Sequence, residues 1–343
     1  MSTLPFAHGG PPLRGRLRAE AEDFEVDEQL GFTADGQGEH LFLRIEKRGA
    51  NTEWVARQLA ARLGVAPAAV GFSGLKDRHA LTRQTFSVHL PGLADPDPDA
   101  LAIEGVRVLE AARHSRKLKR GTHKRNAFRI RLTALEGDAA AAGAVLATIA
   151  ERGVPNYFGE QRFGRGEDNL RLAEALFSGA RLDRQRRGFA LSAARSALFN
   201  RVLGARVAAG NWDAALDGEV WMLAGTHSIF GPQAFDAALA ARLAAGDIDP
   251  TGPLWGRGDL RSSGEVAALE QGIAEGMAGF AAGLAAAGLG QERRALRLRP
   301  AGFVHEREGE DVLVLTFSLP AGTFATSVVR ELCAVDERPR SSA

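Results

Sequence analysis

A dense polar cluster, Lys76-Asp77-Arg78-His79, lies in the segment GFSGLKDRHALTRQTFSV at residues 71–88, shortly after two glycines. Cations on either side of an aspartate on a Gly-rich turn favour the charged form of its carboxyl group. An ionised and positioned aspartate can act as a nucleophile or as a general base. The plainer interpretation is a surface turn with local ion pairs of about 0–1 kcal/mol each. Taken alone, the segment favours that plainer interpretation, so Asp77 needs support from elsewhere in the chain.

A strongly basic run, RHSRKLKRGTHKR, spans residues 113–125 with seven Lys/Arg, two His and no acid. A second basic stretch, RLDRQRR, spans residues 181–187. Such a run is either a solvated face or a strip that contacts phosphates, and charge alone does not decide between them. Sequence rich in hydrophobic residues on both sides of the first run argues against a free tail. The candidate phosphate contacts are Arg113, Arg116, Lys117, Lys119, Arg120 and Lys124.

Three further features have side chains suited to recognising a base. Asn126 and Phe128 are two residues apart, and on a strand this spacing directs both to one face. An amide can read a base edge and an aromatic ring can stack on a base, although a core Phe and a structural Asn fit as well. The segment GVPNYFGEQRFG, residues 153–164, is typical of a rigid shaped loop or an interdomain hinge. Phe324 follows a Gly turn, where it can project into a cleft or lie in a core.

Several classes of protein are disfavoured by what the chain lacks. It has no P-loop, no G-x-G-x-x-G after a strand, no H-E-x-x-H and no G-x-S-x-G, and its eight histidines show no ligand spacing. We therefore expect no bound metal. No apolar run approaches the roughly 20 residues that cross a bilayer, and the N-terminus lacks the pattern of a signal peptide. The single cysteine, Cys333, excludes an internal disulfide and fits a reducing compartment, so a cytoplasmic location is expected.

The elements that must position these residues change in character along the chain. Alternating hydrophobicity predicts strands at 23–30, 40–47, 85–90 and 126–132, and a helix from residue 51 or 52 to 63. An Ala-rich helix follows Asp138 and ends at Gly153. From about 152 to 299 the pattern is mostly helical, including a helix over 191–209 with Ser192 as a possible cap. A strand at 312–320 and a short helix at 327–332 close the chain. This order predicts a mixed α/β domain interrupted by an insertion.

Together, these segments resemble the TruD family of transfer-RNA pseudouridine synthases. The matching pieces, in family order, are DFEVDEQLGFTADGQGEHLFLRIEKRGANT, GLKDRHALTRQTFSV, RHSRKLKRGTHKRNAF, GVPNYFGEQRFG, LSAARSALFN and LPAGTFATSVVREL. They cover nearly the whole chain. The resemblance implies an α/β (α+β) fold in which a catalytic domain with a mostly antiparallel or mixed sheet is interrupted by a largely helical domain. The expected catalytic domain is 1–151 plus 300–343, and the expected insertion is 152–299.

The resemblance also implies an activity and a set of site residues. Family members isomerise uridine 13 of tRNA to pseudouridine without a cofactor, which would make this chain a tRNA-binding isomerase. The sequence has no coiled-coil heptads that suggest an obligate dimer, so we expect a monomer. The family's catalytic aspartate maps to Asp77, and the basic residue that pairs with it maps to Arg18. The aromatic residue that packs against the target ring maps to Phe128. The other pocket positions map to Phe24, Asn126 and Phe324.

Two positions depart from the family pattern, and some alternatives stay open. Arg18 stands where Lys is familiar, which keeps the charge but changes reach and hydrogen-bond geometry. Arg125 stands at a familiar Gly, which matters only if that backbone needs a positive φ. The sequence does not choose between Asp77 as nucleophile and as base. The rival functions are an RNA chaperone on the same scaffold, a synthase for another RNA site, and an enzyme acting on a small nucleoside.

Overall fold

The computed structural model describes residues 4–97 and 101–336 of the 343-residue chain. The chain forms two compact units, each assembled from three separate stretches. The first, which we call the sheet unit, comprises Pro12–Ala142, Pro300–Gly322 and Cys333–Ala343. The second, the mixed unit, comprises Met1–Pro11, Gly143–Arg299 and Thr323–Leu332. These units describe packing; the catalytic and inserted domains expected from the family are a functional division and remain a proposal.

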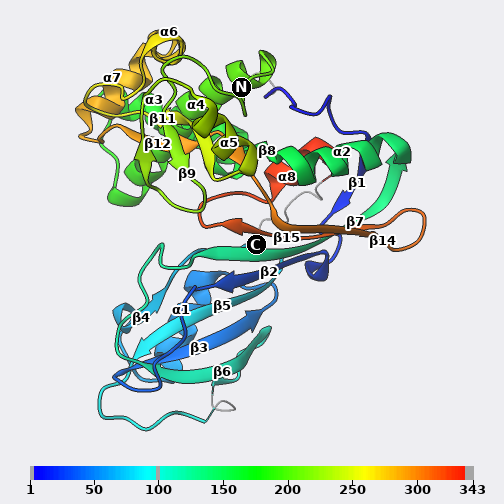
Figure 1. The fold of residues 1–343 in the computed structure, drawn as a ribbon. Coiled ribbons are helices and arrows are strands. Elements are labelled where there is room, and N and C mark those ends of the chain that lie inside the picture. Colours follow the sequence, from blue (N-terminus) through cyan, green and yellow to red (C-terminus); the bar gives the residue numbers. More distant parts are fainter. Residues whose placement is uncertain (1–3, 98–100, 337–343) are drawn as a thin grey trace. The chain divides into compact units, whose positions relative to one another are not determined.

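A ten-stranded mixed sheet forms the sheet unit (Figure 1). Its order is β14-β15-β7-β2-β5-β3-β6, with β1 pairing with β7 and β16, and β4 with β5. The β1–β16 and β2–β5 pairs are parallel and the others antiparallel. The strands are β1 Leu13–Leu17, β2 Phe24–Gln29, β3 His40–Lys47, β4 Val70–Phe72, β5 Leu81–His89, β6 Val106–His114, β7 Arg125–Gly137, β14 Ala301–Arg307, β15 Leu313–Pro320 and β16 Cys333–Asp336. Short helices connect them: η1 Ala21–Asp23, α1 Thr52–Arg62 and η2 Pro67–Ala69.

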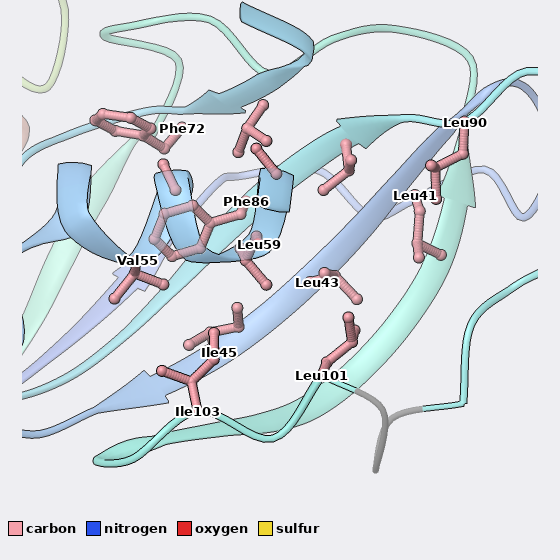
Figure 2. Close-up of a cluster of buried hydrophobic side chains, with 14 of the residues drawn as sticks. Leu41, Leu43, Ile45, Val55, Leu59, Phe72, Phe86, Leu90, Leu101 and Ile103 are labelled. Carbon is pink, nitrogen blue, oxygen red and sulfur yellow. The ribbon is translucent and has the colours of Figure 1, made fainter. Parts of the chain in front are cut away.

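One face of this sheet carries the hydrophobic core of the unit. Leu41, Leu43 and Ile45 alternate along β3 as predicted and are fully buried. Val55 and Leu59 of α1 belong to the same buried cluster, which Figure 2 shows. The helix begins and ends within one residue of its predicted bounds, because its apolar residues recur at helical spacing over one face of the sheet.

The other face carries paired charges. Arg83 on β5 contacts Glu25 on β2 and Glu46 on β3. Arg129 on β7 also contacts Glu25. Because successive residues of a strand point to opposite faces, these charged residues of β2, β3, β5 and β7 alternate with residues that lie on the first face.

The mixed unit contains helices and small sheets. Strands β10 Ile229–Phe230, β9 Trp221–Leu223, β11 Ile248–Leu254 and β12 Glu292–Ala295 form a four-stranded sheet in that order, and β8 Val154–Pro155 pairs with β13 Arg297–Leu298. The helical elements are η4 Glu160–Phe163, η5 Arg165–Glu167, α3 Asp168–Phe177, α4 Arg184–Ala208, α5 Ala237–Ala245, α6 Gly264–Gly276, α7 Ala278–Ala286 and α8 Thr326–Leu332. Helix α2, Ala139–Arg152, contains the boundary between the two units.

Two expectations for this region are corrected by the structure. The mostly helical pattern missed the four-stranded sheet, since β11 contains two prolines, which indicate a turn rather than a paired strand. The helix expected from residue 191 begins at Arg184, so Ser192 is not its cap. Asp183 caps it instead by accepting a hydrogen bond from the Arg186 amide. Across the described residues, no helix combines the length and apolarity needed to span a membrane.

Candidate active site

Asp77 lies in the loop between β4 and β5, and its side chain is about one quarter exposed (23%). One carboxylate oxygen, Oδ1, accepts a hydrogen bond from the His79 amide at 3.0 Å. Such a bond to the amide two residues onward closes a local turn and fixes the direction of the carboxyl group. The second oxygen, Oδ2, lies 3.3 Å from an Arg18 guanidinium nitrogen. The carboxylate is therefore held from both sides while part of it stays accessible.

Arg18 follows β1 and adopts a φ of 60°, a left-handed conformation that non-glycine residues rarely adopt. Its guanidinium carbon lies 4.1 Å from the centroid of the Phe24 ring. The arginine is thus stacked on an aromatic face while it meets Asp77. Contact with a ring and a carboxylate at once suits the planar guanidinium. The structure therefore places the predicted partner beside the predicted catalytic residue.

Phe24, Phe128 and Phe317 form a continuous aromatic row on the same face of the sheet. Phe24 and Phe128 meet edge to face with centroids 6.1 Å apart, and Phe128 lies 5.5 Å from Phe317. The register aligns Phe317, Phe128 and Val26 across β15, β7 and β2. Phe24 and Phe128 are almost completely buried. The three rings therefore form a continuous, buried aromatic row that begins at Arg18.

Asn126 stands two residues before Phe128 on β7, with its side chain on the same face as predicted. Its Oδ1 is buried and has no hydrogen-bond partner among the described residues. Its cross-strand neighbour on β2 is Glu28, which forms an ion pair with Lys76, the residue next to Asp77. This amide oxygen lies beside the aromatic row and lacks a donor, so it can accept a hydrogen bond from a bound base. Arg125, just before it, lies outside the positive-φ region, so the departure from glycine requires no backbone strain.

Lys47 is a further residue of the site that the sequence reasoning missed. It lies at the end of β3 with 1% exposure, and its ammonium group donates to the Ala50 carbonyl at 2.7 Å and to the Asp77 carbonyl at 3.1 Å. Burial lowers the pKa of Lys47 to about 8, partly opposed by the charge of Asp77. A signal was present, since Lys47 continues the alternation of Leu41, Leu43 and Ile45 and so falls on the buried face.

The basic run packs beside the Asp77 loop. The Gly121 amide donates to the Ser73 carbonyl at 2.8 Å, and the His123 amide donates to the Ser73 hydroxyl at 2.6 Å. A side chain at Gly74 would lie 3.1 Å from the His123 ring, so the glycine permits this close approach. Burial lowers the pKa of His123, and the charge of Lys76 lowers it further. A segment predicted from its charge alone therefore lies against the loop that carries the catalytic candidate.

The six candidate phosphate contacts differ in their surroundings. Arg113 bonds to Asp95 and to two backbone carbonyls. Arg120 pairs with Glu53 and lies over the Phe72 ring, while Lys117 donates to the Ala68 carbonyl. The remaining three are exposed and form no ion pair with any described residue: Arg116, Lys119 and Lys124. The cations available to a ligand are therefore these three, which lie in the loop between β6 and β7. Arg113, on β6, is bound to protein groups instead.

Phe324, the last of the predicted pocket residues, belongs to the mixed unit and precedes α8. Its ring meets that of Phe158 edge to face with centroids 6.1 Å apart. The structure thus brings Asp77, Arg18, Phe24, Asn126 and Phe128 together in the sheet unit and assigns Phe324 to the other one. Among the described residues, no group of His, Cys, Asp and Glu is arranged to hold a metal ion.

Comparisons with known proteins agree on one family. The family model described as tRNA pseudouridine synthase D (TruD) matches residues 2–180 and 173–332. A tRNA pseudouridine synthase D from Xanthomonas campestris pv. campestris is 50% identical over 98% of this chain and 96% of the relative. One from Aeromonas hydrophila is 49% identical over the same shares. A crystal structure of a putative tRNA pseudouridine synthase D from Methanosarcina mazei matches with a TM-score of 0.72 over 95% of both chains. At 21% sequence identity, that match supports the fold.

Proposed function

The chain belongs to the TruD family of tRNA pseudouridine synthases, and we propose that Asp77 is the carboxylate with which it isomerises uridine 13 of tRNA. The enzyme is an isomerase that converts a uridine of tRNA into pseudouridine. The observation that carries the assignment of Asp77 is its geometry. The carboxylate is partly accessible, oriented by the His79 amide and paired with Arg18 at 3.3 Å. A group fixed in this way needs little rearrangement when the substrate arrives.

The target uridine has to leave its stack before it can react, which costs roughly a few kcal/mol. In the proposed complex, Phe128 offers the ring against which the uracil packs, with Phe24 as a further pocket residue. Phe324, in the mixed unit, is a further proposed substrate-binding residue. Asn126 Oδ1 accepts a hydrogen bond from the uracil N3–H, which gives this buried oxygen a donor. The exposed cations Arg116, Lys119 and Lys124 hold RNA phosphates next to the Asp77 loop.

Asp77 assists cleavage of the C1′–N1 bond and formation of the C1′–C5 bond. As a nucleophile, its carboxylate forms a bond to C1′ while the C1′–N1 electron pair passes to uracil. The rotated uracil then displaces the carboxylate through C5. As a base, it removes a sugar proton as the same bond breaks and returns that proton later. In both routes the C5 proton is finally lost and N1 gains one, so that the product is an isomer. Arg18 keeps the carboxylate oriented for either route.

Substituting Asp77 with Asn tests the assignment with little change in shape. Asn retains an oxygen for the His79 amide but loses the negative charge opposite Arg18. We expect product to fall by a factor on the order of 10⁴ or more, with tRNA affinity within about threefold of wild type. Carbodiimide labelling of pseudouridine with primer extension measures the product, and filter binding measures the affinity. Full product from Asp77→Asn would remove Asp77 from the mechanism.

The same assay separates the rival functions. An RNA chaperone on this scaffold would bind tRNA and form no pseudouridine. A synthase for another site would label a position other than 13, and an enzyme for small nucleosides would convert free uridine. We further propose that the protein acts as a monomer in the cytoplasm, where the buried thiol of Cys333 remains reduced. Burial raises the pKa of Cys333 to about 11, which keeps it protonated and unreactive.

A further inference from the structure

Arg162 in the mixed unit is a half-buried cation whose protein contacts are neutral. It lies in η4, within the segment GVPNYFGEQRFG, and donates to the Ser192 hydroxyl at 2.8 Å. Its guanidinium carbon is 5.3 Å from the Phe158 ring centroid and 5.8 Å from that of Phe324. Among the described residues, no carboxylate forms an ion pair or hydrogen bond with it. Burial alone lowers the pKa of Arg162.

A second arginine lies against the same aromatic ring. The guanidinium carbon of Arg294, on β12, is 4.2 Å from the Phe158 centroid, and the side chain donates to Asn156 Oδ1 at 2.6 Å. Burial lowers the pKa of Arg294 to about 9, and the positive charge of Arg162 contributes to this shift. Two like charges are thus drawn out of water around one ring. Burying the charge of Arg162 without a carboxylate among the described residues is unfavourable, and an anion bound to Arg162 would compensate it.

The other buried arginines of this unit show the contrast. Arg206 pairs with Glu219 at 2.9 Å, Arg293 with Glu270 at 2.8 Å, and Arg297 with Asp249. Each of them has a carboxylate as its counterion. Arg162 has no such counterion among the described residues and lies beside two aromatic rings. Its planar set of donors suits bidentate hydrogen bonds to phosphate oxygens.

We propose that Arg162, with Arg294 behind it, binds a phosphodiester of the substrate RNA. The choice of which phosphodiester rests on the proposed function. Phe324 touches both Arg162 and Phe158, so a base packed on Phe324 would bring its own or the adjoining phosphate to the guanidinium. The segment GVPNYFGEQRFG would then be a binding loop rather than a hinge, because it supplies Asn156, Phe158 and Arg162 to one site.

The test is binding of a tRNA transcript to the full-length protein at several salt concentrations, without turnover. Arg162→Gln should weaken binding roughly tenfold and reduce the slope of log K against log salt by about 0.7–0.9. Arg165→Gln is the matched control. Arg165 is exposed and lies three residues after Arg162, and the substitution removes the same charge. It should stay within about twofold of wild type. Equal salt slopes for Arg162→Gln and wild type would overturn the proposal.

A second variant separates the charge of Arg162 from the geometry of its guanidinium group. Arg162→Lys keeps the charge and loses the planar fork, so it should retain the wild-type salt slope with an affinity between those of Gln and wild type. A slope for Arg162→Lys as low as that of Arg162→Gln would contradict a charge-based role. Loss of product with unchanged affinity would refute phosphate binding, and the assignment of Asp77 would stand either way.

Discussion

Replacing Lys47 with methionine removes a cation that is buried behind the Asp77 loop while keeping a chain of similar size. The ammonium group bonds only to the carbonyls of Ala50 and Asp77 in the described structure, and burial lowers its pKa from 10.5 to about 8. The difference is about 2.5 pH units (10.5 − 8), and each unit corresponds to 1.36 kcal/mol, so the shift is equivalent to about 3 kcal/mol.

The sign of the pH dependence follows from proton binding. Below pH 8 both the folded and the unfolded protein hold the proton, and the cost of burying the charge is present in full. Between pH 8 and 10.5 the folded protein releases the proton while the unfolded chain retains it. The unfolded state then binds more protons, so the free energy of unfolding rises with pH. The wild type should therefore gain up to about 3 kcal/mol relative to Lys47→Met across this window.

Urea unfolding at pH 7, 8, 9 and 10, followed by circular dichroism, measures that difference. Subtracting the variant from the wild type cancels the other groups that titrate in this range. Lys124→Met serves as the control, since Lys124 is exposed and should show no pH-dependent difference. Because Lys47 also holds the Asp77 carbonyl, Lys47→Met should lower kcat about tenfold with little change in tRNA affinity. A constant gap between wild type and Lys47→Met from pH 7 to 10 would refute the reasoning.

Arg18→Gln should lower kcat by roughly tenfold to hundredfold, because it removes the charge 3.3 Å from the Asp77 carboxylate. Arg18→Lys keeps that charge and should retain most of the wild-type kcat. Single-turnover kinetics measures both, and equal losses in the two variants would show that charge is not what matters. Replacing Arg116, Lys119 and Lys124 together with Gln should reduce the salt slope of tRNA binding by about 2–3, since each cation neutralises one phosphate. Arg113→Gln should leave that slope unchanged, because Arg113 is bound to Asp95 and two carbonyls.

Elements with local periodicity could be predicted from the sequence closely. The strand expected at 40–47 is β3, and the helix expected to end at Gly153 is α2, which ends at Arg152. Elements without such a pattern were missed. β11 carries two prolines, and the residues of the first turns of α4 show only a basic stretch. In both cases the tertiary surroundings decide the conformation against a weak or misleading local preference.

Local periodicity in the sequence identifies only some of the residues of the candidate site. Asn126 and Phe128 share one face because a strand alternates, and the sequence alone is enough to show it. Lys47 could have been recognised by the same rule. The contacts that make these residues a site depend instead on register. Phe128 stands across from Val26 on β2, and Asn126 across from Glu28, only because β2 and β7 pair as they do.

Three features follow from the sequence alone: the polar segment around Asp77, the alternation that divides side chains between two faces of the sheet, and the family to which these segments belong. Three contacts depend on the folded chain. Arg18 meets Asp77, which is 59 positions later, Lys47 donates a hydrogen bond to the Asp77 carbonyl, and Arg113 forms an ion pair with Asp95. Periodicity is a property of neighbouring residues and can be read locally. Ion pairs and desolvation depend on which distant segments pack together, and no local pattern encodes that.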